Sequence, residues 1–133
     1  WFEFQFNYKK GDDSKKELTN NAFFKLSGGE KALAMYIPLF AAVVAKYESA
    51  GKDTPRIISL DEAFAGVDDS NIRDMFRILT KLDLEYIINS QVLWGEYDTI
   101  PSLAINELIS DPRAKVVSVI RYLWNGHVRE LVN

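Results

Sequence analysis

The chain has 133 residues, of which 47% are hydrophobic and 26% charged, a balance typical of one soluble globular domain. Lysine and arginine number 16 against 19 acidic residues, so the net charge of −3 gives no overall basic excess for binding nucleic acid. Cysteine is absent and histidine occurs once, which excludes disulfides, thiolate zinc sites, a cysteine nucleophile and a multi-histidine metal site. Carboxylates, hydroxyls, amides and backbone groups remain for any chemistry.

The sequence opens on a pattern that predicts a strand. As expected of a strand with one buried face, large aromatic residues alternate with polar ones at Phe2, Phe4, Phe6 and Tyr8. The polar residues 9–21 predict a loop or hairpin tip, and Ala22–Leu26 predicts a short return strand. Because the chain starts within this alternation and without methionine, we expect it to be a piece of a longer protein. Four lysines of the loop could contact DNA phosphates, although a solvated hairpin tip is the commoner explanation: Lys9, Lys10, Lys15 and Lys16.

A long helix is predicted to begin at the Ser27-Gly28-Gly29-Glu30 sequence and to run to about Ser49. It is apolar nearly all round, which indicates a position inside a larger body. Pro38 in its middle predicts a kink, because proline has no N–H to bond the preceding turn. The apolar stretch Ala32–Ala45 is shorter than the roughly 20 residues that span a bilayer, so we expect no membrane segment.

The rest of the chain alternates between strand and helix patterns. Short apolar runs predict buried strands at Arg56–Leu60 and Tyr86–Ile88. Helices are predicted at Pro101–Ile109 and at Asp69–Leu82, where one apolar face comprises Ile72, Met75, Phe76 and Leu79. An Asn125-Gly126 turn predicts a hairpin between Val116–Leu123 and Val128–Val132. This order predicts an α/β fold with a mostly parallel sheet and an antiparallel terminal hairpin.

The start of the long helix has two interpretations. Ser27 followed by Glu30 is a capping box, which satisfies free N–H groups at a helix start and needs no ligand. Gly28 and Gly29 are poor helix formers, however, and cost stability unless something approaches the backbone closely. Free N–H groups beside Lys31 would form an anion site suited to phosphate. Both interpretations stay open at this point.

Asp61 and Glu62 directly follow the first buried strand. Ligands of open α/β sheets bind beyond the carboxyl ends of the strands, and two adjacent carboxylates repel each other unless a cation or a proton lies nearby. One carboxylate can hold Mg²⁺ on a nucleotide, and the other can orient or deprotonate water. The simpler alternative is that Asp61 caps the next turn and Glu62 is solvated.

The order of these features resembles the ATP-binding cassette ATPases. The resemblance is carried by a signature motif LSGGE at 26–30, a Walker B strand IISLDE at 57–62 and a D-loop that ends at Asp68. LSGGEKALA followed by DEAFAGVDD is similar to the SMC and recombination-repair branch, whereas transporters usually have LSGGQ and DEPTSGLD. Two longer segments, LDEAFAGVDDSNIRDMF and INSQVLWGEYDTIPSLAINEL, are similar to SMC-like proteins of bacterial Wadjet-type plasmid-defence systems.

This resemblance implies that residues 1–133 are the C-terminal lobe of an SMC-like ATPase head, with ATP and Mg²⁺ as ligands. It implies that Asp61 supports Mg²⁺ and that Glu62 polarises the attacking water. The residues implied in binding the nucleotide of the opposite head, with the last reaching across the dimer contact, are Ser27, Gly28, Gly29, Glu30, Lys31 and Asp68. Implied partners are an N-terminal lobe with the Walker A loop, a second head, kleisin-like or other accessory subunits, and DNA. The implied location is the cytoplasm at the nucleoid, away from membranes.

Two departures from the family pattern affect the expected activity. The phosphate-binding G-x-x-x-x-G-K-[ST] loop is missing, so we expect the fragment alone to be inactive. Aligning YIINSQ at 86–91 with the family's FIVITH places Gln91 at the position of the switch histidine. Glutamine can hydrogen-bond a γ-phosphate or water but takes no proton near neutral pH, which implies slower or differently regulated hydrolysis. The single histidine, His127, is expected at the surface of the terminal hairpin.

Two alternative functions stay open. A non-hydrolysing structural head module that holds partner subunits is favoured slightly by Gln91 and opposed by the retained carboxylates and glycines. A transporter-type cassette is disfavoured by the signature and Walker B sequences.

Overall fold

The structure is a computed structural model that describes residues 3, 5–51, 53–91, 93, 95–111 and 113–132. Of the aromatic residues expected to form the first strand, Phe2 and Phe4 lie outside the described residues. In chain order the elements are β1 (Asn7–Tyr8), β2 (Lys16–Glu17), α1 (Asn20–Phe24), α2 (Gly28–Glu48), β3 (Ile57–Leu60), α3 (Asp69–Lys81), β4 (Glu85–Ile88), β5 (Leu103–Asp111), β6 (Val116–Trp124) and β7 (Arg129–Val132).

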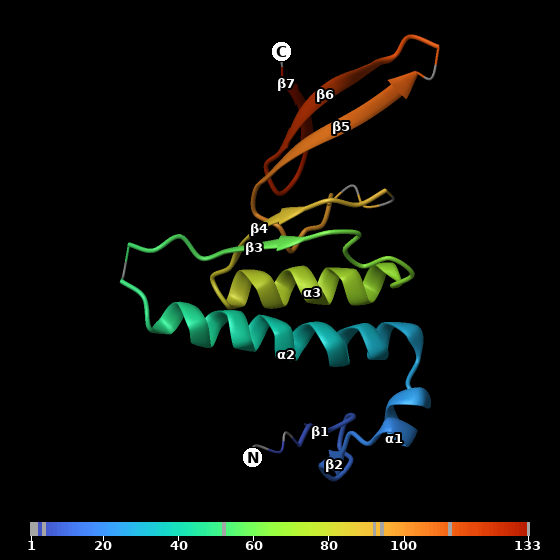
Figure 1. Ribbon diagram of the computed structural model, residues 1–133, viewed down its shortest axis with the longest axis vertical. Helices are drawn as coiled ribbons and strands as arrows, with labels where there is room; N and C mark the ends of the chain where they lie inside the picture. The colour runs from blue at the N-terminus through green and yellow to red at the C-terminus, as the bar shows by residue number, and fades with distance from the viewer. Residues whose placement is uncertain are drawn as a thin grey trace.

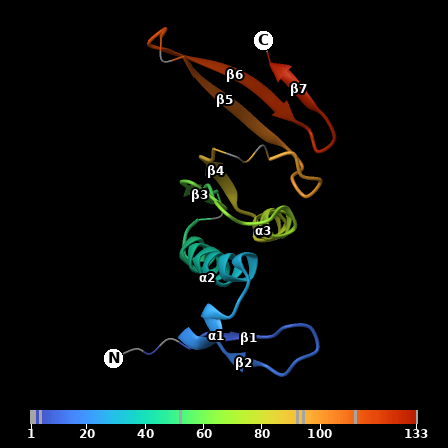
Figure 2. The same ribbon diagram turned by 90° about the vertical axis from the view of Figure 1, so that its right-hand side faces the viewer.

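The elements are stacked along the long axis of the molecule (Figure 1). The antiparallel pair β1–β2 lies at one end and the antiparallel sheet β5-β6-β7 at the other, with the parallel pair β3–β4 between them (Figures 1 and 2). Helices α2 and α3 contact each other and lie on the side of β3–β4 that faces β1–β2. This mixture of helices with parallel and antiparallel strands agrees with the α/β class predicted from the sequence. Among the described residues the parallel part consists of β3 and β4.

A β3-α3-β4 unit forms the centre of the molecule. Its strands pair in register from Ile57 with Glu85 to Leu60 with Ile88. Helix α3 turns a buried face toward the core, and this face consists of the four residues predicted from the helical spacing, Ile72, Met75, Phe76 and Leu79. The helix is capped by Asp68, and the strands bury Ile58 and Leu60. The predicted strand–helix–strand order is therefore confirmed here.

Aromatic rings join the helices to the strands. Phe76 of α3 lies 5.5 Å from the ring of Phe64, 5.4 Å from that of Tyr86 and 5.4 Å from that of Tyr97. Phe64 also packs edge-on against Tyr36 of α2 at 5.1 Å. Such edge-to-face and tilted pairs add to the free energy gained by burying the rings. The core is therefore an aromatic cluster centred on Phe76.

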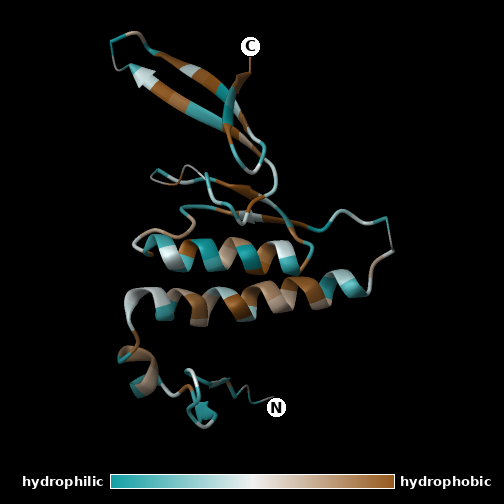
Figure 3. Cartoon of the chain, turned by 180° about the vertical axis from the view of Figure 1, so that it is seen from behind, coloured by the Kyte–Doolittle hydropathy of each residue, from teal (hydrophilic) through white to brown (hydrophobic). Residues whose placement is uncertain are grey.

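Helix α2 is less buried than its composition predicts. Its 21 residues bury only Gly29 and Phe40, whereas Met35, Ile37 and Leu39 are exposed. Hydrophobic residues extend along much of the helix (Figure 3). By length and composition alone α2 could also cross a membrane. One side of α2 packs through Phe40 onto the core, and the other side has no covering layer among the described residues.

Two predictions for the N-terminal region are wrong. Ala22–Leu26 forms no strand, because Thr19 caps α1 by accepting a hydrogen bond from the Ala22 N–H at 3.2 Å. The return strand is instead β2, which pairs with β1. Phe6 is half-exposed and does not lie in the core. The hairpin has strands of two residues each, and no other layer packs on it among the described residues.

The prediction of a helix at Pro101–Ile109 is also wrong, because this segment lies mostly in strand β5. Half-buried and exposed residues alternate along it with a period of two, as in Leu103 and Ala104. Pairing with β6 over nine positions decides the conformation. The hairpin predicted at Asn125 is confirmed, since its Oδ1 accepts hydrogen bonds from the His127 and Val128 N–H groups at 3.0 and 2.9 Å.

Replacing the central ring tests this core. Phe76→Ala is expected to lower the free energy of unfolding by about 3–5 kcal/mol, because Phe76 is 1% exposed and contacts three other rings. Met35→Ala is the control, because Met35 is 65% exposed and its loss should change stability by about 0.5 kcal/mol or less. Urea denaturation of both variants measures the difference. Equal losses of unfolding free energy in the two variants would contradict a core centred on Phe76.

Candidate functional site

The candidate residues gather at one end of the central layers. The carboxyl ends of β3 and β4 and the amino ends of α2 and α3 all lie on the same side (Figure 1). This arrangement follows from chain direction. Because β3 and β4 are parallel and α3 runs back between them, the carboxyl ends of both strands lie on the same side of the sheet. The edge therefore combines carboxylates from the strand ends with the N–H groups of two helix starts.

Asp61 and Glu62 are exposed at the end of β3. The Oδ1 atom of Asp61 accepts hydrogen bonds from Asn89 Nδ2 at 2.8 Å and from the Glu62 N–H at 3.1 Å. Glu62 has a φ of 48°, in the left-handed region that non-glycine residues rarely adopt. Strained backbone of this kind is concentrated at functional sites, where the surrounding structure holds it.

The residues after Glu62 anchor this turn in the core. Ala63 N–H donates to the Asn89 carbonyl at 3.3 Å, and Phe64 N–H donates to the Tyr36 hydroxyl at 3.3 Å. Phe64 also has a positive φ, 62°, and its side chain is 2% exposed. The buried ring and the two backbone bonds hold the turn, so that its carboxylates face outward.

The donor set suits a magnesium ion carried by a nucleotide. Mg²⁺ prefers carboxylate oxygens and is usually bound through one or two of them together with substrate phosphates and water. Among the described residues, Asp61 Oδ1 is engaged by two donors, whereas its Oδ2 accepts no hydrogen bond. No group of three or more acidic or histidine side chains able to hold a metal occurs in that part of the chain. Asp61 therefore fits as one ligand of an ion whose other ligands come with the substrate.

The start of α2 has the predicted capping box. Ser27 Oγ accepts from the Glu30 N–H at 3.3 Å, and Glu30 Oε2 accepts from the Ser27 N–H at 2.8 Å. The other carboxylate oxygen of Glu30 forms an ion pair with Lys10 Nζ at 2.6 Å. The bond from Lys10 and those from Ser27 lower the pKa of Glu30 to about 2. Glu30 is thus an ionised structural cap, and Lys10, a candidate DNA contact, is engaged with it.

The two glycines differ in their surroundings. Gly28 is exposed, and a Cβ added there would lie 3.8 Å from the Gly66 carbonyl oxygen. Gly29 is buried, and a Cβ added there would lie 2.0 Å from Asn71 Nδ2 and 2.7 Å from Asp68 Oδ2. Close packing against the start of α3 therefore explains Gly29 without a ligand. Ser27 and Gly28 remain the open part of the predicted anion site.

Asp68 caps α3. Its Oδ1 accepts from Ser70 Oγ at 2.7 Å and from the Asn71 N–H at 3.1 Å, and its Oδ2 accepts from Asn71 Nδ2 at 2.6 Å. The bond from Ser70 and the two from Asn71 lower the pKa of Asp68 to about 2. Asp68 is exposed, yet its carboxylate is held by its own helix start. Any contact to a second molecule would use this preset orientation.

Gln91 and Lys31 lie at the margins of the site. Gln91 is exposed beyond the end of β4, and its side chain makes no hydrogen bond to the described residues. Lys31 is half-buried beside an open apolar groove of about 380 Å³ on α1 and α2, lined also by Phe23, Ala32, Met35, Tyr36 and Leu39. No hydrogen bond or ion pair joins either residue to the Asp61-Glu62 turn within the part of the chain that the structure describes.

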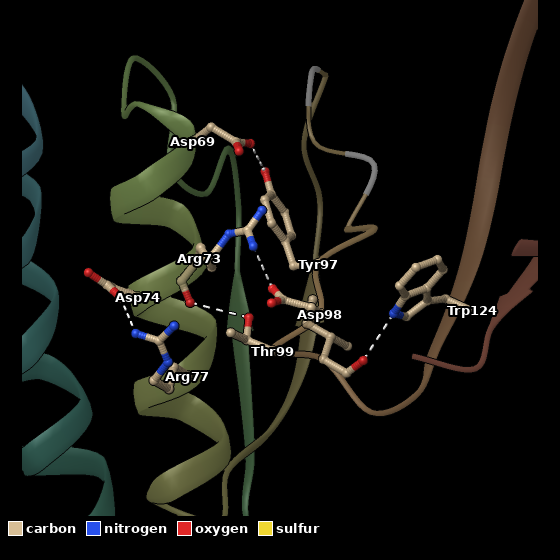
Figure 4. A network of polar contacts seen from close by, with 9 residues as sticks. Asp69, Arg73, Asp74, Arg77, Tyr97, Asp98, Thr99 and Trp124 are labelled. Carbon is tan, nitrogen blue, oxygen red and sulfur yellow. Dashed lines mark hydrogen bonds and ion pairs between the residues drawn. The ribbon is translucent and has the colours of Figure 1, made fainter. Parts of the chain in front are cut away.

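The segment after β4 carries a polar network that sequence patterns missed (Figure 4). The Tyr97 hydroxyl donates to Asp69 Oδ1 at 2.9 Å, and Arg73 pairs with Asp98 at 2.7 Å while its guanidinium lies 5.9 Å from the Tyr97 ring centroid. Burial, followed by the bond to Asp69, raises the pKa of Tyr97 to about 12, so the hydroxyl stays a donor. This network ties α3 to the segment that follows Gln91.

The same segment reaches the terminal sheet. Trp124 Nε1 of β6 donates to the Ile100 carbonyl at 3.0 Å, and both residues are buried. The Thr99 hydroxyl donates to the Arg73 carbonyl of α3 at 3.3 Å. Residues 97–100 therefore join the α3 start to β6. Nothing in the spacing of these residues signals a network, because its members come from three separate stretches.

The packing of Gly29 can be tested against its neighbour. Gly29→Ala is expected to destabilise the protein, because the new methyl group would displace the side chains of Asn71 and Asp68 and break the hydrogen bond between them. Gly28→Ala is the matched control and should be tolerated, since the nearest atom would be 3.8 Å away. Thermal melting of the two variants measures the effect. Equal melting temperatures would show that Gly29 is not packed against α3.

The cap at Asp68 predicts a dependence on pH. Because folding lowers its pKa from 3.8 to about 2, the ionised cap stabilises the protein above pH 3.8, and this contribution is lost as the pH falls through about 2. Asp68→Asn removes the titration, so the difference in stability between wild type and variant should shrink as the pH falls through that range. Urea midpoints at a series of pH values measure it. A constant difference would contradict the lowered pKa.

The comparisons with known proteins agree with this geometry. A solved structure reported as "Structural biochemistry of ATP-driven dimerization and DNA stimulated activation of SMC ATPases" shares the fold, with a TM-score of 0.55 and 20% identity. The match covers 88% of this chain and 63% of that chain, so this chain spans less than two thirds of that structure. No curated protein matches the chain. A family model described as SbcC/RAD50-like, Walker B motif, matches residues 1–81. The fold is that of the C-terminal lobe of an SMC-like ATPase head, and the chain belongs to the SbcC/RAD50-like Walker B family.

Proposed function

We propose that this chain supplies the C-terminal half of an ATPase head that binds ATP with Mg²⁺ and hydrolyses ATP when two heads engage. The observation that carries the proposal is the exposed Asp61-Glu62 pair at the carboxyl edge of β3, on the side where α2 and α3 begin. Membership of the SbcC/RAD50-like family supports this function over that of a transporter-type cassette. Residues 1–133 act as one part of the head.

The Asp61-Glu62 turn divides the proposed chemistry between two carboxylates. Asp61 holds the metal, directly or through water, through Oδ2, which accepts no hydrogen bond from the described residues. Bound Mg²⁺ neutralises charge on the phosphates. Glu62 orients and polarises the water that attacks the γ-phosphate, a general-base role for which an exposed carboxylate at the sheet edge is suited. Gln91 hydrogen-bonds the γ-phosphate or that water, without taking a proton.

The start of α2 is proposed to face the nucleotide of the opposite head. Its first N–H groups have no partner within the helix, and the macrodipole favours an anion there. Gly28 is exposed and supplies such a group. The Ser27 N–H already donates to Glu30 Oε2, so the exposed Ser27 contributes its hydroxyl, and Lys31 adds a positive charge nearby. Gly29 and Glu30 set the geometry through packing and capping. Asp68 is held beside Gly29, and we propose that it reaches the same contact with the partner head.

The proposed partners complete what this chain lacks. An N-terminal lobe with the Walker A loop supplies the rest of the nucleotide site, and a second head supplies the opposite signature motif. Accessory subunits of kleisin-like type and DNA bind through the full complex, which acts in the cytoplasm at the nucleoid in chromosome or plasmid maintenance, repair or anti-plasmid defence. The match to a structure reported for ATP-driven dimerization and DNA-stimulated activation of SMC ATPases supports the proposed second head and the proposed action on DNA.

A structural head module without hydrolysis is the second candidate. The observation that favours it is Gln91, which stands at the aligned position of the switch histidine and has no hydrogen-bond partner among the described residues. In that case the heads would bind partner subunits but turn over no ATP.

Two substitutions in the full protein test the proposed function. Glu62→Gln is expected to bind ATP, to lose at least about tenfold in turnover and to trap engaged heads, because it removes the group that polarises water. Ser27→Arg is expected to prevent engagement, since a large side chain would occupy the helix start. ATP turnover and ATP-dependent head dimerisation by light scattering measure both effects. The isolated chain is expected to show no ATPase activity.

The control is Glu85→Gln, an exposed glutamate at the opposite end of β4. It should leave both readouts unchanged. Rapid steady-state turnover by Glu62→Gln would remove Glu62 from its role. Absence of turnover in the wild-type full protein, with ATP-dependent engagement retained, would favour the structural module.

A further inference from the structure

Asn89 makes three contacts to the Asp61-Glu62 turn. Its N–H donates to the Leu60 carbonyl at 3.0 Å and its carbonyl accepts from the Ala63 N–H at 3.3 Å. Its side-chain Nδ2 donates to Asp61 Oδ1 at 2.8 Å. The backbone of Asn89 thus spans the turn on both sides, while its side chain reaches the carboxylate between them.

The side-chain contact differs in kind from the two backbone contacts. Any residue except proline could make both backbone bonds at position 89, whereas only a side chain with a donor of this length can bond the Asp61 carboxylate. Asn89 is exposed, so its amide is not needed to fill the core. The side chain therefore acts on the orientation of Asp61 rather than on packing.

The bond selects which oxygen of Asp61 stays available. Oδ1 accepts from both Asn89 Nδ2 and the Glu62 N–H, and two donors on one oxygen hold the carboxylate plane in one rotamer. Oδ2 accepts no hydrogen bond from the described residues, and Asp61 is exposed. A carboxylate preset in this way loses less conformational entropy when it binds a cation.

We propose that Asn89 is a positioning residue that fixes Asp61 Oδ2 for the metal of the nucleotide. This inference rests on the proposed role of Asp61 and extends it to a side chain outside the motifs identified in the sequence. Partners that orient a metal ligand by hydrogen bonding typically change metal affinity by about 10- to 100-fold when they are removed. The same is expected here.

The test uses Mn²⁺ as the probe in the full protein that carries this chain. Asn89→Leu removes the donor while keeping a similar side-chain size, and Asn89→Ala removes it without adding apolar bulk. The expected result is Mn²⁺ binding to the ATP-bound protein weakened by about tenfold or more, measured by electron paramagnetic resonance. ATP binding in the presence of a chelator and the melting temperature should stay unchanged.

The matched control is Asn106→Leu, the same chemical change at an exposed strand residue of β5 that makes no side-chain hydrogen bond to the described residues. It should bind Mn²⁺ as wild type does. If Asn89→Leu lowers the melting temperature more than this control, the result for Asn89→Ala decides. In the Asp61→Ala background, Asn89→Leu should cause no further loss of Mn²⁺ affinity, because it acts through Asp61.

The outcomes separate this inference from the proposed function. Weak Mn²⁺ binding by Asp61→Ala together with wild-type binding by Asn89→Leu and Asn89→Ala would overturn the role of Asn89 alone. An added loss in the Asp61→Ala background would likewise show that Asn89 does not act through Asp61. Wild-type Mn²⁺ binding by Asp61→Ala would instead overturn the metal role of Asp61 in the proposed function, and with it this inference.

Discussion

The candidate site depends on the packing of the Phe64 ring between Tyr36 and Phe76. Phe64 follows the Asp61-Glu62 turn by two residues, and its ring is buried between α2 and α3. Glu62 in this turn and Phe64 after it both have positive φ, which costs free energy for residues other than glycine. Burial of a phenylalanine ring contributes about 1.5–3 kcal/mol, which compensates for part of this cost. The aromatic core thereby keeps two carboxylates at the sheet edge.

The capped starts of α2 and α3 place backbone N–H groups on the same side of the molecule as the carboxylates. Ser27 and Asp68 each accept hydrogen bonds from their own helices, and Gly29 lets the two helix starts approach closely. The cap does not use the N–H of Gly28, so this group stays open at the start of α2. Structural capping and anion binding are therefore compatible uses of one segment, and the two interpretations of the LSGGE sequence do not exclude each other.

The exposed apolar surface fits a lobe that is only part of a head. Helix α2 leaves Met35 and Leu39 exposed, and β5 and β6 leave Leu108 and Val119 exposed where they pair. Patches of apolar surface on a soluble protein commonly mark contacts with other chains or segments. Under the proposed function, these exposed faces are available to the N-terminal lobe and the other proposed partners.

The sequence by itself determined the local elements with strong signals. The helical spacing of Ile72 to Leu79, the capping box at Ser27, the apolar run before Asp61 and the Asn125 turn each report a short-range preference of the chain. Only tertiary structure decided the conformation of 103–111, which pairing with β6 makes a strand, and the roles of Asn89 and Gly29. Those three depend on residues far apart in the chain, and local patterns carry no information about which distant groups will meet.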